Sequence, residues 1–119
     1  QAKTELLITV DCGITNLREV RRAKQAGMQV VIVDHHQPAE LPNADAIVDP
    51  AQPGCPFQPY KLCAAGLVWM LLVVMRQQLR EHETFAKLVP DPKEFLDLAA
   101  LGTVCDMVPL IEVNRVLAA

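Results

Sequence analysis

The chain has 119 residues, enough for one domain or part of one with a sizeable buried core. Apolar residues make up 51% of it and aromatic residues only 4%, so the core has to be built from aliphatic side chains, as is typical of α/β proteins. The formal net charge of −3 gives no overall attraction to a polyanion. Nucleic-acid binding would therefore need a local basic patch, a metal ion or another domain.

The four cysteines form no Cys-x-x-Cys pair, which disfavours a zinc knuckle, and nothing in the sequence indicates secretion. We expect reduced thiols and a cytoplasmic protein. Residues 63–75, CAAGLVWMLLVVM, form an apolar run that is shorter than the roughly 20 residues that cross a membrane. The sequence therefore predicts a buried helix there, and no membrane association.

The first part of the chain predicts a strand, a helix and a second strand. Residues 6–10, LLITV, and residues 29–33, QVVIV, are short β-branched runs. Between them, apolar residues recur on one helical face, from a capping-box pattern at Asn16 and Glu19 to a closing Gly27. This is a βαβ unit, so we expect parallel strands, with the first of them central in the sheet.

The rest of the chain predicts one more strand and several helices. Residues 46–48 are a short apolar run, and the prolines of residues 50–59 exclude regular structure. A long helix is expected over residues 64–82, apolar in its first half and charged in its second, and another over residues 93–101. Residues 114–119, NRVLAA, begin a further helix. The predicted fold class is α/β, a parallel Rossmann-like sheet flanked by helices.

Ionisable residues follow both strands of the βαβ unit. Asp11 comes directly after the first strand, and Asp34, His35 and His36 come directly after the second. Because parallel strands deliver their carboxyl ends to one edge of a sheet, these side chains should share a crevice. Two carboxylates so close would repel each other unless a cation lies between them, and carboxylates with imidazole suit Mn²⁺, Mg²⁺ or Zn²⁺, the harder ions being favoured. A single strand-end aspartate is usually a turn former, but this combination predicts a metal site.

Other candidates are weaker. Cys12 and Cys105 each adjoin an aspartate, but neighbours on a strand face opposite ways, so we expect small buried fillers. Asp49 precedes a proline and is expected to open a turn. The basic residues of 18–24 are expected to form a solvated face, with phosphate contact as the alternative. A dinucleotide-binding motif is excluded because Gly13 is one glycine where three are needed.

Three motifs, taken in order, resemble the DHH phosphoesterase superfamily. They are Asp11-Cys-Gly13, Asp34-His35-His36, and residues 101–110, LGTVCDMVPL, which are followed by Asn114-Arg115. Three residues alone recur by chance, but the ordered combination is specific. The third motif and the segment CAAGLVWMLL are similar to the superfamily's single-stranded-DNA-specific exonucleases. The resemblance extends over essentially all 119 residues.

This resemblance implies a centre with two Mn²⁺ or Mg²⁺ ions that hydrolyses phosphodiester bonds with metal-activated water. Asp11 would be shared between the ions, while His35 and Asp106 would bind one of them. His36 would lie beside the scissile phosphate, and Asp34 would support the histidines. The implied substrate is single-stranded DNA, degraded 5′ to 3′ in DNA repair and recombination, with other DNA repair proteins as partners.

Parts of the superfamily's pattern have no counterpart in residues 1–119, namely an upstream Asp-x-Asp motif and the later DHHA1 and OB-fold domains. We therefore expect a partial DHH domain with little or no nuclease activity by itself. One alternative is another DHH phosphoesterase, acting on short oligonucleotides, cyclic dinucleotides or pyrophosphate. A second is a non-catalytic scaffold with a DHH fold, against which the intact motif residues argue.

Overall fold

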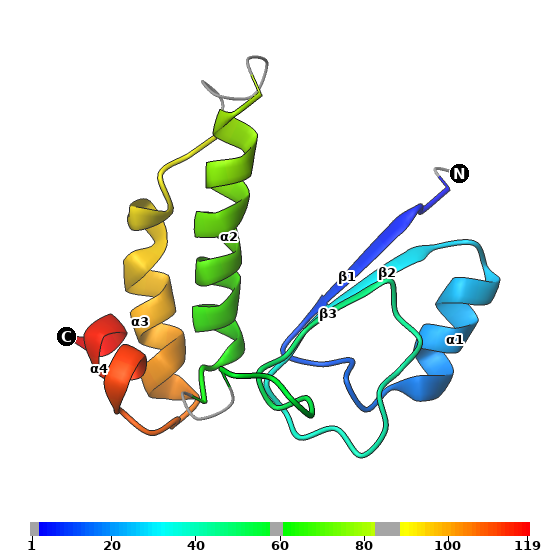
Figure 1. The fold of residues 1–119 in the computed structure, drawn as a ribbon, viewed down its shortest axis with the longest axis horizontal. Coiled ribbons are helices and arrows are strands. Elements are labelled where there is room, and N and C mark those ends of the chain that lie inside the picture. The colour runs from blue at the N-terminus through cyan, green and yellow to red at the C-terminus, as the bar shows by residue number, and fades with distance from the viewer. Residues whose placement is uncertain (1–2, 58–60, 83–88) are drawn as a thin grey trace.

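The computed structural model describes residues 3–57, 61–82 and 89–119. The first part of the described chain contains the three strands and the first helix, and helices alone make up the second part (Figure 1). The elements are β1 (Leu6–Val10), α1 (Leu17–Gln25), β2 (Gln29–Val33), β3 (Ala46–Val48), α2 (Ala64–Arg80), the 3-10 helix η2 (Pro92–Phe95), α3 (Leu96–Cys105) and α4 (Glu112–Ala118). All three strands have the bounds that the sequence predicts.

The strands form one parallel sheet in the order β1-β2-β3. Val10 pairs with Val33, which in turn pairs with Val48, so the three strands end level with one another. Two backbone hydrogen bonds of 3.0 Å extend the sheet by one residue, from Asp11 N–H to the Val33 carbonyl and from Asp34 N–H to the Val48 carbonyl. The two aspartates therefore leave the sheet at the same edge.

β1 lies at the edge of the described sheet, and not at its centre as its apolar sequence predicts. The central strand is β2. On one face of β1 the side chains of Leu6, Ile8 and Val10 are each about half exposed. An apolar strand pattern reports which residues avoid water, but it does not report which segments cover them, so it could not distinguish an edge strand from a central one.

Helices cover both faces of β2, which confirms the predicted α/β fold class (Figure 1). α1 packs against one face, where the buried residues of its cluster are Ile14, Val20, Val30 and Ile32. α2 and α4 contribute to the cluster on the other face, where the buried residues are Val33, Leu62, Leu67 and Leu117. We call α2, α3 and α4 the helical layer. The two clusters hold the carboxyl edge of the sheet between α1 and this layer.

A close contact holds the C-terminal end of α3 against the N-terminal end of α2. A β-carbon at Gly102 would lie 2.4 Å from the β-carbon of Ala65, so only glycine allows this approach. Thr103 is fully buried in the same contact, and its hydroxyl donates to the Ala99 carbonyl at 2.7 Å and lies 3.6 Å from Cys63 Sγ. The position of the chain after α3 is thus set by α2.

The start of α1 differs from the prediction. The sequence predicts a capping box, but the Asn16 side chain makes no hydrogen bond to the helix backbone. Its amide instead donates to Glu19 Oε2 at 3.4 Å. The side chains that the capping box would use are therefore paired with each other at the surface. Gly27 ends the turn after the helix with φ +83°, as predicted.

The later helices also differ from the predictions. α2 ends at Arg80, two residues earlier than predicted, and its residues 73–75 are exposed although a buried helix was expected. The predicted helix 93–101 starts as a 3-10 turn and continues to Cys105, because Gly102 serves a helix contact and does not end the helix.

The proline-rich loop has no helix or strand in its described part, residues 50–57. The last residues of that predicted loop, 58 and 59, lie outside the described residues. Among the helices that the structure describes, none combines the length and the apolar character that crossing a membrane requires.

Candidate metal centre

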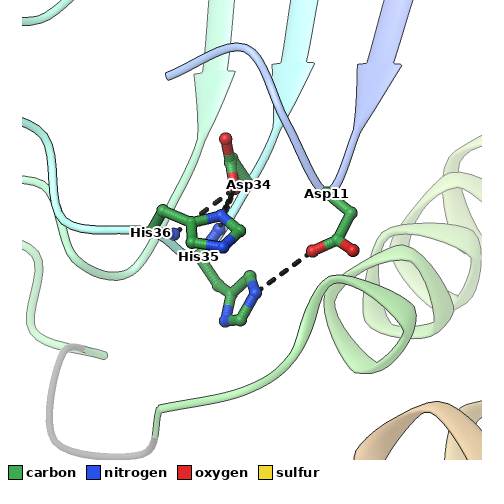
Figure 2. A group of neighbouring side chains, drawn as sticks. All are labelled: Asp11, Asp34, His35 and His36. Atoms are coloured by element: carbon green, nitrogen blue, oxygen red, sulfur yellow. Dashed lines mark hydrogen bonds and ion pairs between the residues drawn. The ribbon is translucent and has the colours of Figure 1, made fainter. Parts of the chain in front are cut away.

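Four side chains gather where β1 and β2 end (Figure 2). Asp11 follows β1, and Asp34, His35 and His36 follow β2. Each offers one potential ligand atom, and these atoms all lie within 4.8 Å of one another. The level ends of the two strands produce this cluster, as expected from a parallel sheet.

Asp11 stands at a sharp turn that exposes its carboxylate. Its φ is +63°, a left-handed conformation that is uncommon for residues other than glycine, although aspartate tolerates it better than most. Gly13 completes the turn with φ +114°, and a β-carbon there would lie 2.5 Å from Thr9 Oγ1. The Asp11 side chain remains 61% exposed, and its Oδ1 points toward His35.

Asp34 is turned inward and has a different environment. Its side chain is only 1% exposed, and its Oδ2 accepts the Ile14 backbone N–H at 3.0 Å. Oδ1 accepts the His35 backbone N–H at 2.8 Å and lies 2.6 Å from His36 Nδ1. Burial raises the pKa of Asp34, but the hydrogen bonds from the His36 ring and from the backbone outweigh it, so the pKa lies below its ordinary value. Asp34 is an ionised anchor for the loop and for one imidazole.

His36 is held by Asp34 and extends into solvent. The hydrogen bond to Asp34 raises the pKa of His36 above its ordinary value, against the opposing effect of burial. Because Nδ1 is taken by the carboxylate, Nε2 is the ring atom that remains available for a ligand or substrate. The His36 side chain is 56% exposed, so that atom can be reached from outside.

His35 connects the cluster to the helical layer. Its Nε2 lies 3.1 Å from Asp11 Oδ1 and 3.5 Å from Asp106 Oδ2. Asp106 caps the C-terminal end of α3, so the contact described above between α3 and α2 determines where this carboxylate lies. One imidazole nitrogen thus faces two carboxylates from separate elements. Spacing along the sequence gave no reason to place Asp106 here; only the resemblance did.

The donor set fits a divalent cation of the harder kind. Asp11, Asp34 and Asp106 put three carboxylates in one small region, and the repulsion among them favours a bound cation. Carboxylate oxygens with imidazole nitrogen suit Mn²⁺ or Mg²⁺, and Mn²⁺ accepts imidazole more readily. Asp11, His35 and Asp106 are the residues positioned to hold an ion, whereas both oxygens of Asp34 are occupied internally. These roles remain predictions.

Two cavities adjoin the cluster. A cavity of about 360 Å³ is lined by His35 and Asp106 together with Gln37, Lys61 and residues 107–109, among others. A second, of about 430 Å³, is lined by Asp11 and Asp106 with the N-terminal end of α2 and the C-terminal end of α3. Asp106 therefore borders both cavities, whereas Asp11 borders only the second.

Among the remaining sequence candidates, the prediction for Asp49 is correct and the one for Cys12 and Cys105 is wrong. Asp49 forms a turn as expected, because its Oδ1 accepts the Ala51 backbone N–H at 2.7 Å, and burial raises its pKa. Cys12 and Cys105 were expected to be buried fillers, but both are exposed. Cys12 lies in the turn after β1, and Cys105 is the last residue of α3. Neither residue lies in a strand, so the alternation of strand side chains does not apply to them.

One structural residue near the cluster was not assigned from the sequence. Asn114 is fully buried, and its amide donates to the Pro109 carbonyl at 2.9 Å and to the Lys61 carbonyl at 3.1 Å. It thus joins the segment after Asp106 to the segment before α2. The signal that could have found it is an amide side chain three residues before Leu117, on the same face of the helix as this apolar residue.

Comparisons with known proteins agree with this arrangement. The family model described as "DHH family, N-terminal domain" matches residues 2–103. The chain is 42% identical to the single-stranded-DNA-specific exonuclease RecJ of Bacillus subtilis, over 95% of the chain and 13% of that protein. It is also 42% identical to RecJ of Haemophilus influenzae, over 96% of the chain and 20% of that protein. The chain thus spans a fifth or less of the length of these relatives.

Solved structures give the same result. A crystal structure of exonuclease RecJ bound to manganese matches with a TM-score of 0.77 and 38% identity, over 95% of this chain and 27% of that one. RecJ from Thermus thermophilus in complex with Mn²⁺ matches with a TM-score of 0.76 and 37% identity, over 95% of this chain and 16% of that one. With the motif residues gathered at the sheet edge and the family model matching most of its length, the chain belongs to the DHH family.

Proposed function

We propose that this chain is part of the catalytic domain of a metal-dependent exonuclease that hydrolyses the phosphodiester bonds of single-stranded DNA. The observation that carries the proposal is the convergence on His35 Nε2 of Asp11 Oδ1 at 3.1 Å and Asp106 Oδ2 at 3.5 Å. It is supported by about 40% identity to RecJ exonucleases over nearly all of the chain. A DNA substrate would place the protein in the cytoplasm, with DNA repair proteins as partners.

The cofactor that we propose is Mn²⁺ or Mg²⁺. The donor set supports this choice, as do the manganese ions bound by two structures similar to this chain. When bound, such ions lower the pKa of water and stabilise the charge that develops on phosphoryl oxygens. Asp11, His35 and Asp106 would hold them.

The remaining residues of the DHH motif would orient and polarise the phosphate. Asp34 fixes the His36 ring through Nδ1, which directs Nε2 away from the protein interior. Because Asp34 raises the pKa of His36, the protonated ring is favoured at neutral pH relative to a free histidine. Nε2–H could then donate to a phosphoryl oxygen, whose negative charge grows in the transition state.

We also propose that residues 1–119 form part of a DHH domain and that other segments of the full-length protein are required for turnover. The two-ion centre implied by the resemblance needs more ligands than Asp11, His35 and Asp106 supply. The small share of each relative that the chain spans is consistent with this division.

A digestion experiment with the full-length protein tests the proposed function. In Mn²⁺, single strands carrying a 5′ label should release labelled mononucleotide before the strand shortens from its 3′ end, and duplex DNA should be spared. Asp11→Asn should lower the rate at least about 100-fold, because a ligand charge is lost without a change of shape. Asp97→Asn, an exposed acid of α3 remote from the cluster, is the matched control.

The same experiment separates the alternatives. Preferred hydrolysis of cyclic dinucleotides or pyrophosphate would assign the protein to another class of DHH phosphoesterase. Absence of hydrolysis on every substrate, in a protein that still binds Mn²⁺, would indicate a scaffold. Stepwise shortening of the 5′-labelled strand, with the labelled mononucleotide released last, would contradict the proposed polarity alone.

A further inference from the structure

The cavity of about 360 Å³ beside the cluster has the size and the lining of a ligand pocket. His35 and Asp106 form the wall that faces the cluster, and residues 107–109 and Leu62 form an apolar part. Lys61 is the only lysine or arginine among the described residues that line it. A polyanion that reached His35 and Asp106 from this side would therefore meet one cation.

The backbone of Lys61 is fixed from two directions. Leu62 is fully buried beside it, in the cluster that contains Val33 and Leu117. The Lys61 carbonyl accepts a hydrogen bond from the buried Asn114 amide. The same amide donates to the Pro109 carbonyl, so one buried side chain joins two segments that line the cavity.

Left-handed backbone conformations gather around this region. In the described part of the chain, four residues other than glycine have positive φ, namely Asp11, Lys61, Met107 and Glu112. The first three line the cluster or one of its two adjoining cavities. Lysine has no local advantage in this conformation, unlike aspartate, and such strain concentrates at sites that bind ligands. Its φ of +44° is thus maintained by the surroundings of Lys61 and not by its own preference.

The charge of Lys61 has no evident structural use. Lys24 is paired with Asp45 at 2.6 Å and Arg76 with Asp91 at 3.0 Å, whereas the described residues provide no ion pair for Lys61. Its surroundings are nevertheless acidic, because Asp106 lines the same cavity and Asp11 lies close behind His35. A cation in this position reduces the repulsion between the acidic cluster and the phosphate groups of a nucleic-acid strand.

We propose that Lys61 binds a substrate phosphate next to the scissile one, and that this cavity holds the nucleotide to which that phosphate belongs. The inference rests on the proposed function and extends it by assigning a positioning residue for the substrate strand. An ammonium group supplies charge to a phosphate without fixing a base, so the contact should be independent of sequence.

Binding of a single-stranded oligonucleotide to the full-length protein tests the proposal. The probe is a 3′-fluorescein oligothymidylate with phosphorothioate linkages, which slow hydrolysis, and its Kd is measured in Mn²⁺ by fluorescence anisotropy. Lys61→Gln removes the charge at similar length, and Lys61→Gly removes the side chain while suiting the left-handed backbone. Both should raise Kd about tenfold, as expected for loss of a hydrogen bond to a charged group.

Salt dependence and two further variants make the test specific. Lys61→Gln should reduce the slope of log Kd against log salt concentration by about 0.7, the value for one phosphate contact on a single strand. Lys61→Arg should retain most of the affinity. Lys93→Gln, an exposed lysine on η2 remote from the cluster, should leave Kd and the slope unchanged.

Mn²⁺ affinity, measured by calorimetry on the same variants, distinguishes the possible failures. If Lys61→Gln binds Mn²⁺ as tightly as the wild type does but binds the oligonucleotide more weakly, the inference is supported. Unchanged oligonucleotide binding in Lys61→Gln and Lys61→Gly overturns it and leaves the proposed function standing. Weaker Mn²⁺ binding in both variants overturns it in favour of a structural role. Failure of the wild type to bind the probe overturns both proposals.

Discussion

At the scale of single residues, the three side chains of the DHH motif differ in their burial and in the groups that they contact. Three adjacent side chains cannot all reach one ion, and the structure assigns them to different surroundings. Asp34 is buried and satisfied by hydrogen bonds, His35 faces two carboxylates, and His36 faces solvent. Asp34, which gives the motif its first letter, therefore influences the solvent-facing side of the loop only through His36.

This division predicts a pH dependence of stability in metal-free protein. The pKa of His36 is raised by Asp34, so the stability that the pair contributes is fully present below the ordinary histidine pKa of about 6.5 and is lost as the pH rises through the raised value. The pKa of Asp34 is lowered, so the contribution is also lost as the pH falls through that lowered value. The pair contributes most at mildly acidic pH.

Denaturant unfolding in EDTA, measured from pH 3 to pH 9, checks this prediction. Asp34→Asn should lower the free energy of unfolding by about 1–3 kcal/mol at pH 6, because a buried charged acceptor is lost, and by less at pH 9. His36→Asn should show the same dependence on pH. A deficit in Asp34→Asn that grows above pH 7 would contradict the assignment of the pair.

The candidate site was predictable from the sequence only where strands determine it. Asp11 and His35 follow strand ends, and the geometry of parallel strands places any two such residues together. Asp106 depends instead on how two helices pack, which no local pattern reports. The exposure of Cys12 and Cys105 was missed for the same reason, because both adjoin turns whose direction is set by contacts elsewhere.

At the scale of elements, the strands were predicted to the residue and the helices were not. A short β-branched run has both ends marked by polar or turn residues, as in LLITV before Asp11. The helix expected over residues 93–101, by contrast, continues through Gly102, although glycine is unfavourable inside helices. In α3 that cost is offset by close packing against Ala65, and this contact cannot be inferred from either segment alone.

The contact between Gly102 and Ala65 predicts an effect on the metal site. Gly102→Ala should lower the free energy of unfolding by about 1–3 kcal/mol through overpacking, despite the higher helix propensity of alanine. Because Asp106 follows at the end of the same helix, separation of α3 from α2 should also weaken Mn²⁺ binding. Thermal unfolding and calorimetry measure the two effects.

A compensating variant provides the control. Ala65→Gly combined with Gly102→Ala restores room for one β-carbon between the helices, and it should recover most of the lost Mn²⁺ affinity. If the double variant bound Mn²⁺ as weakly as Gly102→Ala, the position of Asp106 would not depend on this contact.

At the scale of the whole molecule, sequence elements far apart meet at one edge of the sheet. The cluster joins the ends of β1 and β2 and meets Asp106 at the end of α3, while Asn114 of α4 holds the adjoining segments. An ion bound by Asp11, His35 and Asp106 would therefore link the sheet to the helical layer. Its binding should stabilise the folded state as a whole.

Thermal unfolding with and without Mn²⁺ checks this prediction. At a concentration 100 times Kd, Mn²⁺ should raise the free energy of unfolding by about 2.7 kcal/mol. His35→Ala should remove most of that gain, whereas Arg21→Ala, on the exposed surface of α1, should retain it. Equal stabilisation of wild type and His35→Ala would remove His35 from the ligand set.

The level ends of β1, β2 and β3 restrict which changes in chain length the protein can accept. Inserting one residue within β1 would place Val10 opposite Asp34, and deleting one would place Cys12 there. Either change would also exchange the inner and outer faces of the strand. The connection between β2 and β3, residues 34–45, is longer than β1. Beyond the DHH motif, its length does not determine which residues face each other in the sheet. Among homologous sequences, gaps should therefore be absent from β1 and tolerated at residues 38–43.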